Sequence, residues 1–233
     1  MPTSGTDERA RRPEEHDATA RREIQIPPLG LAGTLSRPAE AQALILFAHG
    51  SGSSRFSPRN MQVAAALNRR RMATLLLDLL LAEEEADRRN VFNIGLLASR
   101  LMAAVKWAGE EPEIKALPVG LFGSSTGAAA ALAAAAELGS AVGAVVSRGG
   151  RPDLAGSALP RVRAPTLLIV GGADFGVIEL NQEAFWRLGC PKSLEIVRGA
   201  THLFPEPGAL EQVVDLAGNW FERHLVAERA GGP

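Results

Sequence analysis

The stretch PVGLFGSSTGAAAALAAAAEL (Pro118–Leu138) passes from a short apolar run through two glycines straight into a row of alanines. The first part is typical of a buried strand and the second of a helix, with no residues left for a loop between them. Ser125 stands at this corner, two residues after Gly123 and two before Gly127, in the pattern G-x-S-x-G. Such a sharp turn leaves no space for a Cβ at either glycine and pushes the central serine outward. The stretch therefore predicts an exposed serine nucleophile at the carboxyl end of a strand.

The alternation of strand and helix continues on both sides of this corner. Continuous apolar runs of strand length, each followed by a helical pattern, are typical of strands buried on both faces and joined by crossover helices. Two extended runs within 23–38, separated by Pro27, Pro28 and Gly30, predict an antiparallel pair at one edge. The expected fold is a three-layer α/β sandwich with a mostly parallel sheet. The predicted strands are 43–50, 73–80, 119–123, 141–149, 164–172 and 193–199, and the helices are 58–70, 91–110, 127–138, 179–189 and 209–225.

The 233 residues suit a single domain, predicted here to span 23–227. Residues 1–22 carry mixed charges and few apolar side chains, so we expect a disordered tail there and a short tail at 228–233. Helices account for every long connection except 82–90 and 147–163, so no large cap is expected. Aromatic residues on the later helices, Trp186 among them, are interpreted as core contacts.

Charge and cysteine content narrow the class of protein. With 25 basic and 26 acidic residues the chain has no overall field that favours nucleic acid or an anionic membrane. The N-terminus lacks the apolar core of a secretory signal, no run is long enough for a membrane span, and Cys190 is the only cysteine. We therefore expect a cytoplasmic protein that acts on a small molecule. The sequence does not indicate an oligomeric state.

A serine hydroxyl becomes a good nucleophile only when a base removes its proton, so a histidine is required. His202 follows a predicted strand, at the sheet edge where Ser125 is expected, and is the predicted base. His49 directly precedes the glycines after its own strand and is interpreted as ordering that loop. His16 in the tail and His224 near the end of the last helix are interpreted as solvated.

A carboxylate must also orient the histidine. Asp174 ends the strand in TLLIVGGADFG, and the order Ser125, Asp174, His202 is the order of an α/β-hydrolase triad. Asp153 follows the preceding strand and is the competing candidate. It stands after Pro152 at an apparent helix start, where Asp is a common cap, so Asp174 is preferred.

Attack on a carbonyl builds negative charge that two backbone N–H groups must stabilise. The N–H of Thr126 is predicted as one donor because it follows the nucleophile. The second donor is predicted to be the N–H of Ser51, in the loop HGSGSS after the strand ALILFA.

Neither a cofactor nor a metal is expected. The loop HGSGSSR has Arg55 where a dinucleotide fingerprint needs its third glycine, and no lysine follows as in a P-loop. No His, Cys and carboxylate cluster has metal-ligand spacing.

Arg148 and Arg151 follow the strand AVGAVVS and are predicted to lie at the catalytic edge. Either could bind an anionic group of the substrate. The alternative is that one of them pairs with Asp153 or with the acidic run Glu83–Glu85.

Several segments together resemble the dienelactone-hydrolase-like branch of the α/β-hydrolases, in particular the hydrolases associated with phosphoribosyltransferase domains. They are LFAHGSGSSRFSPRN, TLLLDLL, GLFGSSTGAAAAL, VVSRGGRPDLAG, PTLLIVGGADFGVIELN and GATHLFPEPG, within 23–225. The resemblance implies a cofactor-free hydrolase with Ser125, Asp174 and His202 as its triad. Dienelactone hydrolases proper use a cysteine nucleophile, so Ser125 counts against dienelactone itself as the substrate.

The expected activity is therefore hydrolysis of small carboxylic esters or lactones through an acyl-enzyme on Ser125. Without a cap the site should be open and should favour short acyl chains. Two alternatives stay open: a non-catalytic binding or regulatory domain that keeps the fold, and an acyltransferase or perhydrolase that uses the same triad.

Overall fold

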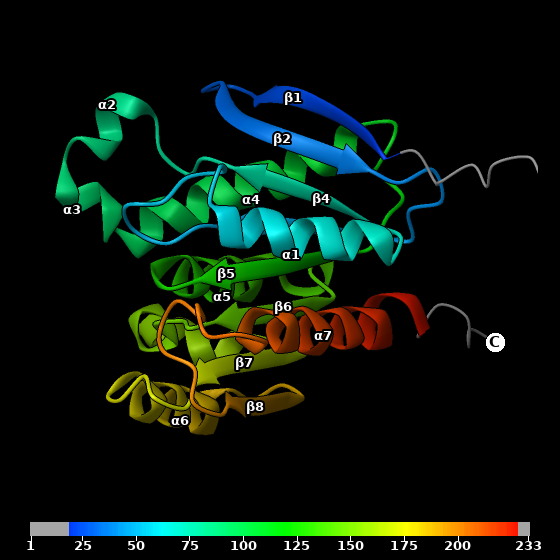
Figure 1. Cartoon of the computed structure of the whole chain (residues 1–233). Coiled ribbons are helices and arrows are strands. Elements are labelled where there is room, and N and C mark those ends of the chain that lie inside the picture. Colours follow the sequence, from blue (N-terminus) through cyan, green and yellow to red (C-terminus); the bar gives the residue numbers. More distant parts are fainter. Residues whose placement is uncertain (1–18, 228–233) are drawn as a thin grey trace, which may run out of the picture.

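One sheet runs through the whole molecule (Figure 1). The structure is a computed structural model and describes residues 19–227. Within them eight strands lie in the order β1-β2-β4-β3-β5-β6-β7-β8. Strands β3 to β8 are mutually parallel, whereas β2 is antiparallel to both β1 and β4. The bounds are β1 Ala20–Ile26, β2 Leu31–Arg37, β3 Ala43–Ala48, β4 Met72–Leu77, β5 Val119–Ser124, β6 Ala144–Arg148, β7 Thr166–Gly171 and β8 Lys192–Val197.

Helices cover both faces of this sheet. Helices α1 and α7 pack on one face and α4, α5 and α6 on the other, which gives the three layers predicted from the sequence (Figure 1). The long helices are α1 Pro58–Arg69, α4 Ile94–Glu110, α5 Thr126–Leu138, α6 Val177–Arg187 and α7 Ala209–Phe221. The short ones are α2 Ala82–Glu85, α3 Arg88–Val91, the 3₁₀ helices η1 Gly139–Ala141 and η2 Pro152–Arg161, and the π-helical turn η3 Glu222–Ala227.

The central strand β3 is apolar throughout, and it faces a helix layer on each side of the sheet. All six residues of β3 are buried. Leu44 and Leu46 join the cluster under α4 and α5, while Ile45 and Phe47 join the cluster under α1 and α7. Successive side chains of a strand point to opposite faces, so a strand buried on both faces needs an unbroken apolar run.

Three sequence expectations need correction. Residues Ala20–Arg22 belong to β1 rather than to a tail, because they pair with β2 and Arg22 bonds ionically to Glu111 at 2.9 Å. The connections 82–90 and 147–163 contain the short helices α2, α3 and η2. Trp186 is not a core residue, since it is 80% exposed. The predicted tails at 1–18 and 228–233 lie outside the described residues.

No helix within residues 19–227 has the length and apolar character that crossing a bilayer requires.

Candidate active site

The corner between β5 and α5 holds Ser125 in a strained conformation, with φ 51° and ψ −124°. A Cβ at Gly123 would lie 2.4 Å from Ala128 Cα, and one at Gly127 would lie 2.2 Å from the carbonyl oxygen of Ala48. Both positions therefore need glycine, as predicted from the sharpness of the turn. A non-glycine residue with positive φ persists only where its surroundings impose it. Here the tight packing of the helix start against β3 and β5 imposes it.

The two adjacent serines of the corner differ in position. Ser124 ends β5 and is 5% exposed, whereas Ser125 is half-buried at the start of α5. Across from Ser125 lies the loop after β3. A Cβ on Gly50 of that loop would be 2.8 Å from the Ser125 Cβ, so the loop backbone directly flanks the predicted nucleophile.

His202 and Asp174 come together from the loops after β8 and β7. The His202 Nδ1 lies 2.7 Å from the Asp174 Oδ2. A carboxylate at Nδ1 fixes the tautomer in which Nε2 is free to accept a proton. The rival carboxylate, Asp153, instead receives two hydrogen bonds from Arg151, at 2.8 and 2.9 Å.

Contacts on both sides brace the histidine loop. Glu206 accepts hydrogen bonds from the Thr201 hydroxyl at 2.6 Å and the Thr201 N–H at 3.1 Å. The side-chain hydrogen bond from Thr201 is the main reason that the pKa of Glu206 lies below its ordinary value. Phe204 is buried with φ 55°, and a Cβ on Gly149 would lie 2.8 Å from the His202 carbonyl oxygen. The loop is therefore closely packed onto the end of β6.

Ser125 and His202 line the same cavity, whose volume is about 520 Å³. Their side chains are not hydrogen-bonded to each other. Catalytic hydrogen bonds are often long without substrate and tighten in the reacting complex, so this geometry is compatible with proton transfer. The cavity is lined by Gly50, Ser51, Gly52, Ser53, Ser57, Pro58, Arg59, Ser124, Ser125, Arg148, Gly149, His202 and Leu203.

One of the two predicted oxyanion donors, the Ser51 N–H, already has an acceptor. The Ser51 N–H donates to the Thr126 hydroxyl at 3.0 Å, so in this state it is not free. The sequence could not anticipate this contact, because it depends on the side chain of a residue chosen only for its N–H. The Thr126 N–H is in the first turn of α5, where backbone donors have no acceptor within the helix.

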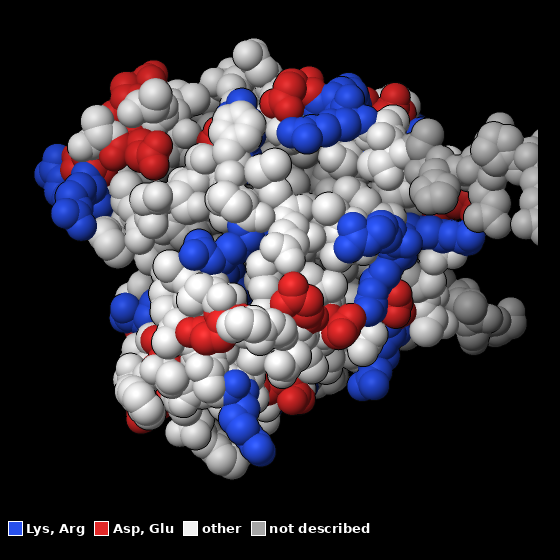
Figure 2. All heavy atoms as spheres, in the orientation of Figure 1, with Lys and Arg blue, Asp and Glu red and all other residues white. Residues whose placement is uncertain are grey.

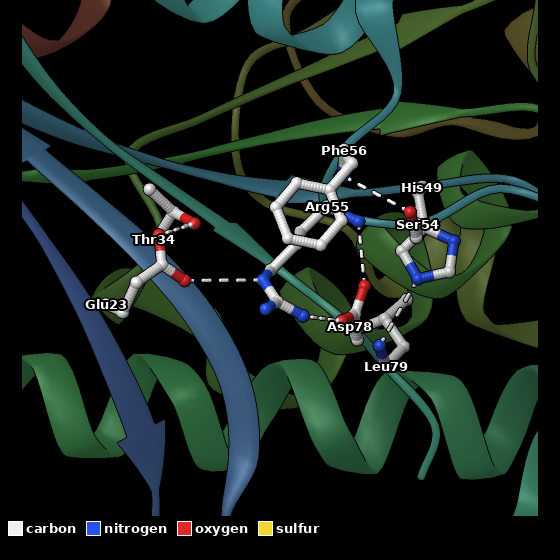
Figure 3. Close-up of polar contacts among 8 residues, drawn as sticks. All are labelled: Glu23, Thr34, His49, Ser54, Arg55, Phe56, Asp78 and Leu79. Atoms are coloured by element: carbon white, nitrogen blue, oxygen red, sulfur yellow. Dashed lines mark hydrogen bonds and ion pairs between the residues drawn. The ribbon is translucent and has the colours of Figure 1, made fainter. Parts of the chain in front are cut away.

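The loop after β3 is held in place by Arg55 (Figure 3). Its N–H donates to Asp78 Oδ1 at 2.7 Å, its guanidinium pairs with Asp78 Oδ2, and its Nε lies 3.5 Å from Glu23 Oε2. Glu23 also accepts a hydrogen bond from Thr34 at 2.8 Å, and the Phe56 ring lies 4.2 Å from the guanidinium carbon. Arg55, the residue that breaks the nucleotide-loop pattern, therefore links the loop after β3 to β1 through Glu23 and to the end of β4 through Asp78.

Neither His49 nor His224 lines this cavity. His49 accepts a hydrogen bond from the Leu79 N–H at 3.3 Å, and its Nδ1 lies 3.0 Å from the Gly50 carbonyl oxygen, so it orders the loop as expected. His224 is half-buried rather than solvated, with its ring centroid 4.4 Å from that of Trp220. His16 lies outside the described residues.

The two predicted arginines behave differently. Arg151 pairs with Asp153, the alternative raised by the sequence, and does not line the cavity. Arg148 lines the cavity and is 6% exposed, and its Nη2 donates to Asn60 Oδ1 at 3.1 Å. Burial, and secondarily the charge of Arg59, lowers the pKa of Arg148 to about 10.

No group of three or more His, Cys, Asp and Glu side chains between residues 19 and 227 could hold a metal ion. Cys190 is buried beside Thr166, and burial raises the pKa of its thiol, which does not favour a reactive thiolate.

Sequence reasoning missed four residues around the site: Arg55, Arg59, Asn60 and Glu206. Three of them stand in SSRFSPRN, directly after the glycine loop, where proximity to that loop could have suggested a role. Nothing in the sequence marked Glu206 as a partner of Thr201.

Comparison with known proteins points to one family. A sequence model described as "Dienelactone hydrolase family" matches residues 82–220. The crystal structure of a dienelactone hydrolase from Anabaena variabilis is 52% identical, covers 89% of this chain and 98% of its own, and superposes with a TM-score of 0.85. Est1E from Butyrivibrio proteoclasticus, 16% identical, covers 88% of this chain and 98% of its own with a TM-score of 0.73, and so shares the fold.

A protein of Mycobacterium tuberculosis named "Putative phosphoribosyl transferase" is 54% identical over 212 residues. The match takes in 90% of this chain but 48% of that protein, so the chain spans about half the length of this relative.

Proposed function

Because the chain belongs to the dienelactone hydrolase family and has a hydrolase fold, we propose that it is a serine hydrolase that cleaves small carboxylic esters or lactones. The observation that carries the proposal is the pairing of Asp174 with His202 at 2.7 Å, beside a cavity that also contains the strained Ser125. We assign no phosphoribosyl transfer to this chain, which spans 48% of the relative so named.

In the proposed mechanism His202, oriented by Asp174, takes the proton of Ser125 as the serine oxygen attacks the ester carbonyl. The tetrahedral intermediate collapses to an acyl-enzyme, and His202 gives its proton to the leaving alcohol. His202 then takes a proton from a water as the water oxygen attacks the acyl group. When the second tetrahedral intermediate collapses, the bond to Ser125 Oγ breaks, His202 gives its proton to Ser125 and the acid leaves. Both side chains are then in their starting protonation states.

The oxyanion is proposed to bind the N–H groups of Thr126 and Ser51. The Ser51 N–H donates to the Thr126 hydroxyl at 3.0 Å, so the oxyanion must either share this N–H with the hydroxyl or displace the hydroxyl from it. The loss of one such donor typically costs about 3 kcal/mol of transition-state stabilisation.

The open cavity supports a preference for small substrates. Its volume of about 520 Å³ would hold a short acyl chain, and the connections around it within residues 19–227 are short helices rather than an inserted cap. Esters of p-nitrophenol with acetate or butyrate should be cleaved faster than long-chain esters. Faster cleavage of a long-chain ester would contradict this preference.

A fluorophosphonate probe tests the proposed function. It should label the wild-type protein, and Ser125→Ala should abolish both labelling and ester hydrolysis. Ser124→Ala is the matched control, since this serine is adjacent but ends the strand. Labelling that survives in Ser125→Ala, or absence of labelling in a folded wild-type protein, would favour a non-catalytic domain.

A further inference from the structure

One wall of the catalytic cavity carries positive charge without a counter-charge. Arg148 and Arg59 both line the cavity, and within residues 19–227 neither forms an ion pair with a carboxylate. On the face shown in Figure 2, basic side chains gather over both ends of α1, the helix that begins at the cavity.

Arg148 is the more unusual of the two. It is 6% exposed, its Nε has no hydrogen-bond partner, and its one hydrogen bond goes to the neutral amide of Asn60 at 3.1 Å. The Phe204 ring also lies near the guanidinium, with its centroid 5.9 Å from the guanidinium carbon. Neither an amide nor an aromatic ring neutralises a charge, and a buried charge without an ionic partner is costly. A buried cation that lines a cleft without a carboxylate partner is a candidate for binding an anionic ligand.

Arg59 and the start of α1 add to the same wall. Ser57 caps this 12-residue helix, and Pro58 and Arg59 form its first turn, so the positive end of the helix dipole faces the cavity. Two guanidinium groups and a helix start together favour a ligand with two negative charges over one with a single charge. Guanidinium groups also match the geometry of phosphate oxygens, which can accept two hydrogen bonds side by side.

We infer that Arg148, Arg59 and the first turn of α1 form a phosphate-binding subsite, and that the substrates are small esters or lactones that carry a phosphate monoester group. This inference rests on the proposed function for the identity of the bond cleaved, but binding of phosphate does not depend on it. The phosphate group anchors the non-reacting end of the substrate, while the ester carbonyl lies at Ser125.

Binding of inorganic phosphate to the Ser125→Ala protein tests the subsite independently of catalysis. Phosphorus NMR or calorimetry at a mildly alkaline pH, where phosphate is a dianion, should detect binding that acetate at equal ionic strength does not match. Adding Arg59→Gln or Arg148→Gln should weaken phosphate binding about tenfold or more. Arg161→Gln is the control, because Arg161 pairs with Glu137 on the surface, at 2.5 Å, and does not line this cavity.

Arg59 is half-exposed, so we expect Arg59→Gln to fold. If Arg148→Gln fails to fold, phosphate binding by Arg59→Gln tests the subsite. Phosphate that binds no more tightly than acetate, or equally well to Arg59→Gln, would overturn the inference.

A pair of substrates then links the subsite to the reaction. The wild type should cleave acetylglycerol phosphate at least about tenfold more efficiently, in kcat/KM, than acetylglycerol, and Arg59→Gln should lose this preference. If phosphate binds as described but neither ester is cleaved, the proposed function fails while the subsite stands. If acetylglycerol is cleaved but phosphate does not bind, only the subsite is wrong.

Discussion

Alanine at Gly127 should destabilise the protein far more than alanine at Gly109, although both glycines lie in helices. At Gly127 the new methyl group would lie 2.2 Å from the carbonyl oxygen of Ala48 and 2.5 Å from that of His49. Both are backbone atoms, which cannot move aside as a flexible side chain can, so relief requires the end of β3 and the start of α5 to separate by about 1 Å, at a cost of about 3 kcal/mol or more. At Gly109, near the end of α4, a Cβ would have no neighbouring atom within 4 Å. That substitution should stabilise by about 0.5 kcal/mol, because alanine loses less backbone entropy in a helix.

Urea unfolding followed by circular dichroism measures the free energy of unfolding of the two variants, which should differ by at least about 3 kcal/mol. Fluorophosphonate labelling of Gly127→Ala should also fall, because the same shift moves Ser125 away from the loop that contains Gly50. A Gly127→Ala protein within about 1 kcal/mol of the wild type would refute the claim that this helix start is locked against β3.

Three further predictions concern the charged groups of the site. Asp174→Asn should lower kcat for ester hydrolysis by about ten-thousand-fold without changing the urea midpoint, since the wrong tautomer of His202 is held in place; a loss below about tenfold would exclude the assigned role. Because the pKa of Glu206 is lowered in the folded state, its hydrogen bonds with Thr201 stabilise the fold above its ordinary pKa, and this contribution is lost as pH falls through the lowered value. Thermal unfolding should thus show Glu206→Gln less stable than the wild type near neutral pH, and the two should converge in acid; a constant difference at all pH values would contradict this. Arg148→Met should leave the free energy of unfolding unchanged or raise it by up to about 3 kcal/mol. The reason is that the charge of Arg148 is buried without an ionic partner, and burial lowers its pKa to about 10. A loss above about 2 kcal/mol in urea unfolding would instead mark Arg148 as a structural residue.

The strand and helix pattern and the serine corner could be predicted because their causes are local. Apolar runs such as ALILFA in β3 specify strands buried on both faces, and Gly123 and Gly127 specify a corner without Cβ atoms. Parallel strands also bring their carboxyl ends to one edge, so residues that follow the strands, such as Asp174 and His202, could be expected to meet.

The error about Trp186 has the opposite origin. Its helix has a helical apolar pattern, but α6 packs beside the sheet edge at β8, where fewer elements cover it, and the side chain is 80% exposed. The residue type predicts that an aromatic side chain prefers burial. Whether neighbouring elements cover that side chain depends on where its helix packs.

By itself, the sequence determined the layers, the corner at Ser125 and the order of the candidate triad, since each follows from periodicity or from residues a few positions apart. Only the tertiary structure decided which charges meet. Arg148 and Arg151 follow the same predicted strand and were assigned the same role. Arg148, however, donates to Asn60, 88 residues earlier, whereas Arg151 donates to Asp153, two residues later. Likewise, the Ser51 N–H meets the hydroxyl of Thr126 across 75 residues. Such contacts depend on strand order and on the exact approach of packed helices, and neither leaves a periodic trace in the chain.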